Sequence, residues 1–256
     1  MASDRLFEPL RAAALSAGRV RTAVAYPLCA SSLGAAVQAR EAGYIEPLLV
    51  GPAARLAALM AELGLRAGSL EIVDTPDDEA LAARAAAGLV TSGQTLFLDA
   101  GSTTSMLADE LAKLSGLTLI TNSFDVALKV GAAGSGANEL IMLGGSVGGP
   151  VCATAGDITI AEIHRYRADV ALLSPVGVDA ECGATSYDLR EAEVARAMAA
   201  NAKQRILLAD FSKIGLCSRV SYCEVNRIDH LVTNTNAQKQ PAFAALKSAV
   251  GKMLVV

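Results

Sequence analysis

The order of apolar runs and amphipathic stretches constrains the fold of this chain more than any other feature of its sequence. Short runs rich in Val, Ile and Leu alternate with Ala-rich amphipathic stretches nearly to the end. Strands of a parallel sheet are buried on both faces and are joined by helices, so this order is typical of βα units. We therefore predict an α/β, Rossmann-like fold with a mostly parallel sheet and helices on both faces. The expected strands are Thr22–Tyr26, Pro47–Val50, Glu71–Val73, Thr95–Asp99, Thr118–Thr121, Glu139–Leu143, Val170–Ser174, Arg205–Ala209, His230–Thr233 and Lys252–Val255.

Helices are expected in most of the gaps, and two of them can be argued from particular residues. In Ala30–Tyr44, Ser31 or Ser32 is a candidate N-cap ahead of an apolar stripe. Leu189–Asn201 follows the candidate cap Asp188 and carries apolar residues on one side and charges on the other. We expect both to be cover helices with no part in the chemistry.

Composition narrows the classes of function. With 256 residues, 52% of them hydrophobic, the chain has enough apolar material for one large α/β domain or two small ones. The formal net charge of −4 gives no support for binding to nucleic-acid phosphates, so we expect no direct DNA binding. No run reaches the roughly 18 apolar residues of a membrane span, and no basic segment with an apolar run opens the chain. We therefore expect a cytoplasmic protein without a membrane partner.

The cysteines predict neither a disulfide framework nor a metal site. There are five, an odd number, scattered without a C-x-x-C spacing, and only two histidines could join them. We expect free thiols in a reducing compartment. We also predict no cofactor.

One turn raises the question of function. Residues 96–107 read LFLDAGSTTSML, which is an apolar run, a hydroxyl-rich turn and the start of a helix. Backbone N–H groups at such a helix start converge on one point, as they do in many phosphate sites. Ser102 or Thr103 would equally serve as an ordinary N-cap. The turn is thus a phosphate site or a helix cap, and its sequence leaves both interpretations open.

A second turn has the glycines that a close ligand needs. Residues 144–150 read GGSVGGP and directly follow an expected strand. Glycine lets the backbone approach a ligand, so Gly144 and Gly145 are candidate binding residues. Ligands of open α/β sheets bind at the carboxyl ends of the strands. We expect one rim to hold the strand ends at Asp99, Thr121, Gly144 and Ser174.

Five segments, in order, carry a resemblance to a known family. They are LFLDAGSTTSMLADEL, LTLITNSFDVAL, ELIMLGGSV, ADVALLSPVGVDAECGATSYDLREAEVARAM and RILLADFSKIG. From about Asp77 to Val256 the chain resembles the ligand-sensing domain of DeoR-family transcriptional regulators. The resemblance implies a fold related to ribose-5-phosphate isomerase and glucosamine-6-phosphate isomerase. It also implies that the domain senses a phosphorylated sugar or a similar metabolite.

The resemblance implies a set of ligand-binding residues at the ends of the expected strands. Amides and hydroxyls of the first turn would bind phosphate oxygens, Lys213 would supply a cation, and Asp99 and Asp179 would accept hydrogen bonds from sugar hydroxyls. Ordinary roles stay open for Lys213 as a solvated lysine, for Asp210 as a turn cap and for Asn122 as a turn residue. The full set carried over is Asp99, Gly101, Ser102, Thr103, Thr104, Asn122, Ser123, Asp179, Asp210, Ser212 and Lys213.

One motif departs from the family pattern. Where many relatives read Gly-Ala-Asp-Gly-Ile-Asp, residues 174–179 read SPVGVD, so one acidic group is missing. In the related isomerases a carboxylate in this region supports proton transfer, which needs a base near the substrate carbon. Enzyme activity is therefore uncertain, and a binding protein is favoured over an isomerase.

Residues 1–76 do not match the Arg-rich helix-turn-helix with which DeoR regulators begin. The stretches RTAVAYPLCASSLGAAVQAREAGYIEPLLVGPAARLAALMAELGL and LEIVDTPDDEALAARAAAGLV resemble instead the N-terminal portion of phosphotransacetylases and phosphate butyryltransferases, over about residues 1–90. That family makes its main acyl-CoA and phosphate contacts in later segments, so we expect a scaffold here. The two resemblances meet in the expected helix Asp77–Val90. A natural fusion and an engineered chimera are both open.

The leading hypothesis is a metabolite-binding protein. We expect residues 77–256 to be a DeoR-type effector domain that binds a phosphorylated sugar or related metabolite, without a helix-turn-helix of its own, after a phosphotransacetylase-like βα segment at 1–76. One alternative is an enzyme acting on sugar phosphates or acyl phosphates, and another is an engineered chimera without a selected function. The expected partner is a small phosphorylated metabolite, and a homo-oligomer is left open.

Overall fold

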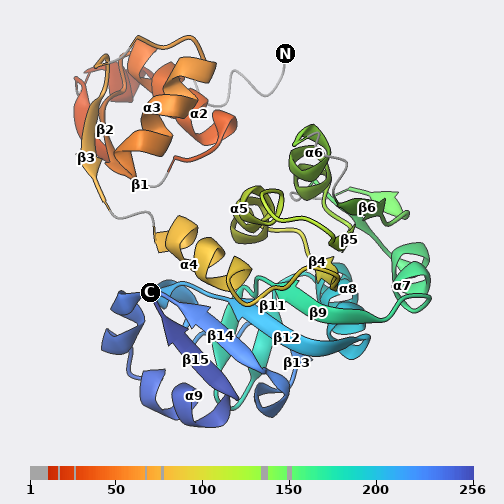
Figure 1. Cartoon of the computed structure of the whole chain (residues 1–256). Helices are drawn as coiled ribbons and strands as arrows, with labels where there is room; N and C mark the ends of the chain where they lie inside the picture. Colours follow the sequence, from red (N-terminus) through yellow and green to blue (C-terminus); the bar gives the residue numbers. More distant parts are fainter. Residues whose placement is uncertain are drawn as a thin grey trace. The chain divides into compact units, whose positions relative to one another are not determined.

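The chain forms two compact units, one up to Asp77 and one from Asp78 to Val256 (Figure 1). The computed structural model describes residues 11–16, 18–25, 27–66, 68–75, 78–133, 138–148 and 152–256. The expected boundary between residues 76 and 77 falls outside these ranges and stays a prediction.

The first unit is a small parallel sheet with helices between its strands. Strands β1 (Val20–Ala25), β2 (Ile45–Gly51) and β3 (Glu71–Asp74) lie in that order and pair in parallel. Helix α2 (Ala30–Glu41) joins β1 to β2, and α3 (Ala53–Glu62) joins β2 to β3. All three strands are predicted from the sequence, although Tyr26, the expected end of the first, lies outside the described residues.

The expected N-cap of α2 is wrong. The cap is Cys29, and neither Ser31 nor Ser32 holds that position. The Ser32 hydroxyl accepts a hydrogen bond from the Cys29 N–H at 3.4 Å and donates one to the Cys29 carbonyl at 3.0 Å. Ser32 therefore supports the cap from the third helical position, as in a capping box.

The second unit is built on a sheet of seven strands, all paired in parallel. Each of the seven corresponds to an expected strand, so the predicted α/β class with a mostly parallel sheet is confirmed. Across the sheet the strands run β15 (Lys252–Val255), β14 (His230–Thr233), β12 (Ala202–Leu208), β9 (Ala168–Leu173), β4 (Thr95–Leu98), β5 (Thr118–Thr121) and β6 (Glu139–Met142).

Helices pack on both faces of this sheet, because alternate strand residues point to opposite sides. Leu96 and Leu98 join one core with residues of α4 (Asp78–Ala87), α5 (Ser102–Leu111) and α6 (Phe124–Ala132). Phe97, between them, joins the other core with residues of α7 (Asp157–Ile163), α8 (Leu189–Ala200) and α9 (Phe243–Ala249). Each fully buried side chain of this size contributes about 1.5–3 kcal/mol to folding. No helix in the described ranges is long and apolar enough to cross a membrane.

The sequence pattern does not predict the antiparallel parts of the second unit. A three-stranded antiparallel sheet lies beside α8, and two short strands pair separately. The antiparallel strands and the short 3-10 helices are β10 (Gly177–Asp179), β11 (Gly183–Ser186), β13 (Val220–Cys223), β7 (Ser146–Val147), β8 (Thr154–Ala155), η1 (Phe211–Lys213), η2 (Val225–Arg227) and η3 (Thr235–Lys239).

A disulfide corrects the expectation that the cysteines are free. Cys182, in the turn after β10, is bonded to Cys217, just beyond η1, with 5.9 Å between their Cα atoms. The remaining cysteines, Cys29, Cys152 and Cys223, are free thiols. The bonded pair is 35 residues apart, so its partners become neighbours only through the tertiary fold.

Candidate functional site

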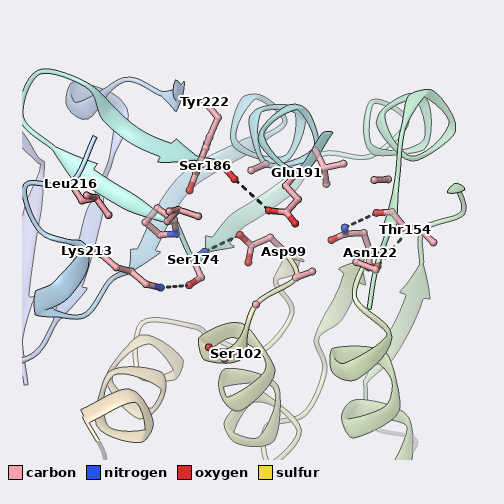
Figure 2. A pocket seen from close by; sticks show the side chains of 18 of the residues that line it. Asp99, Ser102, Asn122, Thr154, Ser174, Ser186, Glu191, Lys213, Leu216 and Tyr222 are labelled. Atoms are coloured by element: carbon pink, nitrogen blue, oxygen red, sulfur yellow. Dashed lines mark hydrogen bonds between the residues drawn. The ribbon is translucent and has the colours of Figure 1, made fainter. Parts of the chain in front are cut away.

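A cavity of about 400 Å³ lies at the carboxyl ends of the central strands of the second unit (Figure 2). Residues that follow β4, β5, β9 and β12 contribute to its wall. Strands β4 and β9 are neighbours, and the chain proceeds from them toward opposite edges of the sheet. Such a reversal of strand order leaves a crevice in which open α/β sheets bind their ligands.

The turn between β4 and α5 leaves the start of a helix open toward the cavity. Its N-cap is Gly101, in extended backbone with φ −178°, so Ser102 and Thr103 are not the cap that the alternative interpretation requires. Ser102 is exposed and lines the cavity, whereas Thr103 and Thr104 are buried. The first N–H groups of a helix have no acceptor within it. Those of α5 are therefore available to an anion at this edge.

Asp99 is a buried carboxyl group at the end of β4. Its Oδ2 accepts a hydrogen bond from the Ser174 N–H at 2.9 Å, and its side chain is only 8% exposed. Burial raises the pKa of Asp99 to about 7, and the Ser174 N–H, the Thr104 hydroxyl and the Lys213 charge only partly oppose that rise. Near neutral pH, Asp99 can therefore be either an acceptor or a donor of a hydrogen bond.

Lys213 carries the positive charge of the cavity. Its Nζ donates to the Ser174 hydroxyl at 3.2 Å, which places it beside the end of β9 (Figure 2). Asp210 is the N-cap of η1 and accepts hydrogen bonds from the Ser212 N–H at 2.7 Å and from the Ser212 hydroxyl at 2.6 Å. Asp210 thus fixes the turn that presents Lys213, as the turn-cap interpretation expects.

The rest of the wall includes an amide, an acid and a phenol. Asn122 donates from Nδ2 to the Thr154 carbonyl at 2.8 Å. Glu191 accepts from the Ser186 hydroxyl at 3.4 Å, and its pKa is raised by burial and by the charge of Asp188. Burial, together with the charge of Asp99, holds the pKa of Tyr222 well above its usual value. Tyr222 is therefore a neutral hydroxyl group at physiological pH.

The structure brings together about half of the residues that the sequence singles out. The candidates that line the cavity are Asp99, Gly101, Ser102, Asn122, Ser212 and Lys213. The others are Thr103, Thr104, Ser123, Gly144, Gly145, Asp179 and Asp210, and they lie outside its lining. Their part in ligand binding stays a prediction, and several have a structural role that can be stated.

The glycines after β6 contact α7. The Gly144 N–H donates to a carboxylate oxygen of Glu162 at 2.6 Å, and the Gly144 carbonyl accepts from the Thr159 hydroxyl at 2.7 Å. Gly145 has φ +142°, and a Cβ there would lie 2.0 Å from the Thr159 hydroxyl oxygen. Position 145 therefore needs glycine for close packing against α7. Beyond the short strand β7, Gly148 lines the cavity, while Gly149 lies outside the described residues.

Asp179 and Ser123 are placed by local contacts. Asp179 accepts a hydrogen bond from the Glu181 N–H at 2.8 Å, and its carboxylate lies within 4.8 Å of the sulfur atoms of Cys182 and Cys217. Ser123 is the N-cap of α6 and accepts from the Val126 N–H at 3.3 Å.

Sequence reasoning misses several residues of the wall. The most polar of them are Ser174, Ser186, Glu191 and Tyr222. Ser174 is expected on this rim of the sheet as the end of a strand, but the sequence does not single it out as a binding residue. Asp188 is the N-cap of α8, as predicted, but α8 is more than a cover helix because Glu191 faces the cavity. Tyr222 lies on a strand that has no signal in the sequence.

Comparison with known proteins identifies one family. The DeoR C-terminal sensor domain matches residues 76–235. The regulator GolR of Listeria innocua is 30% identical over 168 residues, which cover 66% of this chain and 65% of GolR. The repressor GlcR of Bacillus subtilis is 34% identical over 173 residues, 68% of this chain and 65% of GlcR. The glycerol-3-phosphate regulon repressor of Escherichia coli is 28% identical over 152 residues, which cover 59% of this chain and 60% of that repressor.

Solved structures give more distant likenesses. Ribose 5-phosphate isomerase A from Methanocaldococcus jannaschii has a TM-score of 0.38 and 19% identity, covering 53% of each chain. Translation initiation factor eIF-2B from Pyrococcus horikoshii has a TM-score of 0.40 and 13% identity, covering 65% of this chain and 53% of its own. Likenesses at this level carry no information about ligand or activity.

The family match bears on the second unit. The chain spans 65% of the length of both GolR and GlcR, so the activities of those whole regulators do not transfer to it directly. The resemblance of residues 1–90 to phosphotransacetylases, and the fused or engineered origin, stay predictions. Over 76–235 the expectation from the motifs and the independent match agree. This chain belongs to the DeoR family, and it contains that family's C-terminal sensor domain.

Proposed function

We propose that the cavity of the sensor domain binds the phosphate ester of a sugar or of a similar polyol. The observation that carries this proposal is the convergence of Lys213 and the open start of α5 on one cavity. An ammonium group and free backbone N–H groups are both suited to phosphate oxygens. The partly positive helix start adds to the charge of Lys213, so a dianionic group is stabilised between them.

The remainder of the ligand would contact the other groups of the lining. Asp99, Asn122 and Tyr222 supply hydrogen-bonding groups there, and Val194 and Ala195 supply apolar surface. A mixture of this kind suits a short carbon chain that carries hydroxyl groups. A cavity of about 400 Å³ has room for such a molecule.

The name of one relative, a repressor of a glycerol-3-phosphate regulon, agrees with this chemistry. GolR is named as a regulator and GlcR as a repressor of transcription. We infer that the ligand is a signal rather than a substrate, and that its binding serves the sensing step of transcriptional control. The expected absence of direct DNA binding stays a prediction.

The test compares phosphorylated and unphosphorylated ligands by calorimetry. Fructose 6-phosphate, ribose 5-phosphate and glycerol 3-phosphate are titrated beside fructose, ribose and glycerol. Lys213→Ala should weaken the binding of the phosphate esters by about 10–100-fold, because a charge-assisted hydrogen bond contributes about 1.5–3 kcal/mol. Affinity for the unphosphorylated compounds should stay the same.

A matched control removes a lysine elsewhere. Lys239→Ala deletes an exposed ammonium group in η3 that bonds Asn236 at 2.9 Å, and it should leave every affinity unchanged. If the wild type binds no phosphate ester, or if Lys213→Ala binds all of them as tightly as the wild type, the proposed function is wrong.

A further inference from the structure

Three buried polar atoms in the cavity wall have no hydrogen-bond partner within the described part of the chain. They are Asp99 Oδ1, Asn122 Oδ1 and the Tyr222 hydroxyl. The three residues are 8%, 5% and 6% exposed, and all three line the cavity. An unpaired buried polar group costs about 1–3 kcal/mol, so proteins rarely keep one without a reason. Three of them on one cavity point to a ligand that supplies their partners.

The chemistry of these atoms says what the partners must be. Asp99 uses Oδ2 to accept from Ser174, and Asn122 uses Nδ2 to donate to Thr154, which leaves one oxygen of each unpaired. Asn122 Oδ1 is always an acceptor, whereas Asp99 Oδ1 accepts when the carboxyl is ionised and can donate when it is protonated, and a hydroxyl group can pair with both states. A ligand hydroxyl can donate to an acceptor, whereas an ionised phosphate or carboxylate cannot. The Tyr222 hydroxyl can donate or accept. This wall therefore matches hydroxyl groups, with one further oxygen facing Tyr222.

The positively charged and the acidic side chains of the wall lie in different parts of the cavity. Lys213 is the one cationic side chain among the described residues that line the cavity, and Asp99 and Glu191 are the acidic ones. In Figure 2, Lys213 lies on one side of Asp99, and Glu191 and Asn122 lie on the other. Burial already raises the pKa of both acids, so this wall disfavours negative charge. A second anionic group on the ligand would lie against this wall and be destabilised there.

We propose that the cavity selects ligands with one anionic group and a neutral, hydroxylated remainder, and that it rejects bisphosphates and phosphorylated acids. This inference rests on the proposed function and adds the class of phosphate ester that the site accepts. The anion lies against Lys213 and the start of α5. The hydroxyl groups pair with Asp99, Asn122 and Tyr222.

The test uses pairs of probes that differ by one anionic group. Glycerol 3-phosphate is compared with 3-phosphoglycerate, in which a carboxylate replaces the neutral hydroxymethyl group. Fructose 6-phosphate is compared with fructose 1,6-bisphosphate, and inorganic phosphate reports on the phosphate end alone. In calorimetry with the wild type, the neutral-ended member of at least one pair should bind at least about 10-fold more tightly than its doubly anionic partner.

One variant assigns this preference to the acidic wall. Glu191→Gln keeps the shape of the side chain and removes its charge. It should therefore reduce, by about threefold or more, the ratio between the affinity for the neutral-ended probe and the affinity for its doubly anionic partner. Glu193→Gln is the matched control, because Glu193 lies on the same helix, outside the cavity lining, and pairs with Arg196. The control should leave the ratio unchanged.

The outcomes separate this inference from the proposed function. Equal affinity within both pairs, with binding that still depends on Lys213, would overturn the inference and leave the proposed function standing. Equal effects of Glu191→Gln and Glu193→Gln would also overturn it. Failure of every phosphate ester to bind would instead remove the proposed function, and the inference would fall with it.

Discussion

Two neighbouring turns in the sensor domain both contain several small polar residues and are used differently. The turn between β4 and α5 reads DAGSTT from Asp99, and the turn between β5 and α6 reads TNSFDV from Thr121. Both follow parallel, adjacent strands and both are rich in small polar side chains. Only the first leaves its helix start without a side-chain cap, since the N-cap is Gly101 in α5 and Ser123 in α6.

The second turn is filled by other parts of the protein. The Thr154 N–H donates to the Asn122 carbonyl at 2.9 Å, and the Phe124 N–H donates to the Cys152 carbonyl at 3.1 Å. Ser123 uses its own side chain to accept from Val126. The difference shows that hydroxyl-rich composition does not by itself identify an anion site. A helix start without a side-chain cap, on a cavity, is the more informative feature.

The largest expected effect comes from filling the open turn. In Gly101→Val the new Cβ would lie 3.4 Å from Ser174 Cβ and 3.4 Å from the Thr104 hydroxyl oxygen, and its methyl groups would crowd the phosphate position. Binding of fructose 6-phosphate should fall at least about 100-fold by calorimetry, because a phosphate cannot reach the amides. Unfolding free energy should drop by only about 1 kcal/mol, because Val is a poor N-cap but accepts extended backbone. A variant that binds normally would show that the two turns do not differ in function.

The next effect concerns the buried acid of the first turn. The pKa of Asp99 is raised from 3.8 to about 7, so the folded state binds a proton more tightly than the unfolded state. Ionising the buried Asp99 therefore lowers the free energy of unfolding. This loss is absent below about pH 4, grows as the pH rises and is complete above about pH 7. Asp99→Asn should remove it. The stability advantage of the variant should be larger at pH 8 than at pH 5 by about 2–3 kcal/mol in denaturant titrations.

An acid of the second turn provides the control for this prediction. Asp125, in the first turn of α6, is exposed. Asp125→Asn should give a difference from the wild type that hardly changes between the two pH values. If the unfolding free energies of Asp99→Asn and the wild type changed in parallel with pH, burial would not be raising the pKa of Asp99.

The smallest effect is expected at the capped turn. Ser123→Ala removes the acceptor for the Val126 N–H, and loss of an N-cap costs about 1 kcal/mol. Thermal and denaturant unfolding should show this loss. The affinity for phosphate esters should change less than about twofold, against the binding role expected for Ser123 from the sequence, because Ser123 lies outside the cavity lining. Ser102→Ala, in the open turn, should change stability by less than about 0.5 kcal/mol. If Ser123→Ala abolished binding and kept its stability, the assignment of the two turns would have to be exchanged.

The main sheet could be predicted because its strands are apolar on both faces. Leu96 and Leu98 point to one core and Phe97 to the other, so the whole run is hydrophobic and stands out from the helices. Strands β10, β11 and β13 give no such signal. They include Gly177, Gly183, Thr185 and Ser221 and so lack a continuous apolar run, and their pairing depends on the tertiary structure around them.

In the candidate site, too, some residues could be predicted from the sequence and others could not. Asp99, Asn122 and Lys213 could be proposed from the resemblance to the DeoR family, and the strand-end rule supports them because each lies at or shortly after the carboxyl end of an expected strand. Glu191 and Tyr222 reach the cavity from a helix face and from an antiparallel strand. Nothing in their sequence neighbourhood distinguishes them from residues that face solvent or a core. Their role in the wall depends on how distant segments pack together.

A disulfide closes the segment of the chain that supplies part of the cavity wall. Cys182 and Cys217 are 35 residues apart, and Ser186, Glu191 and Lys213 all lie in the loop that they close. A cross-link over a loop of this length limits the shapes available to the unfolded chain and contributes about 4 kcal/mol in the chain-entropy description. Reduction would restore that conformational freedom without removing a single group from the wall. The stability of this part of the cavity wall therefore depends on whether Cys182 and Cys217 stay oxidised.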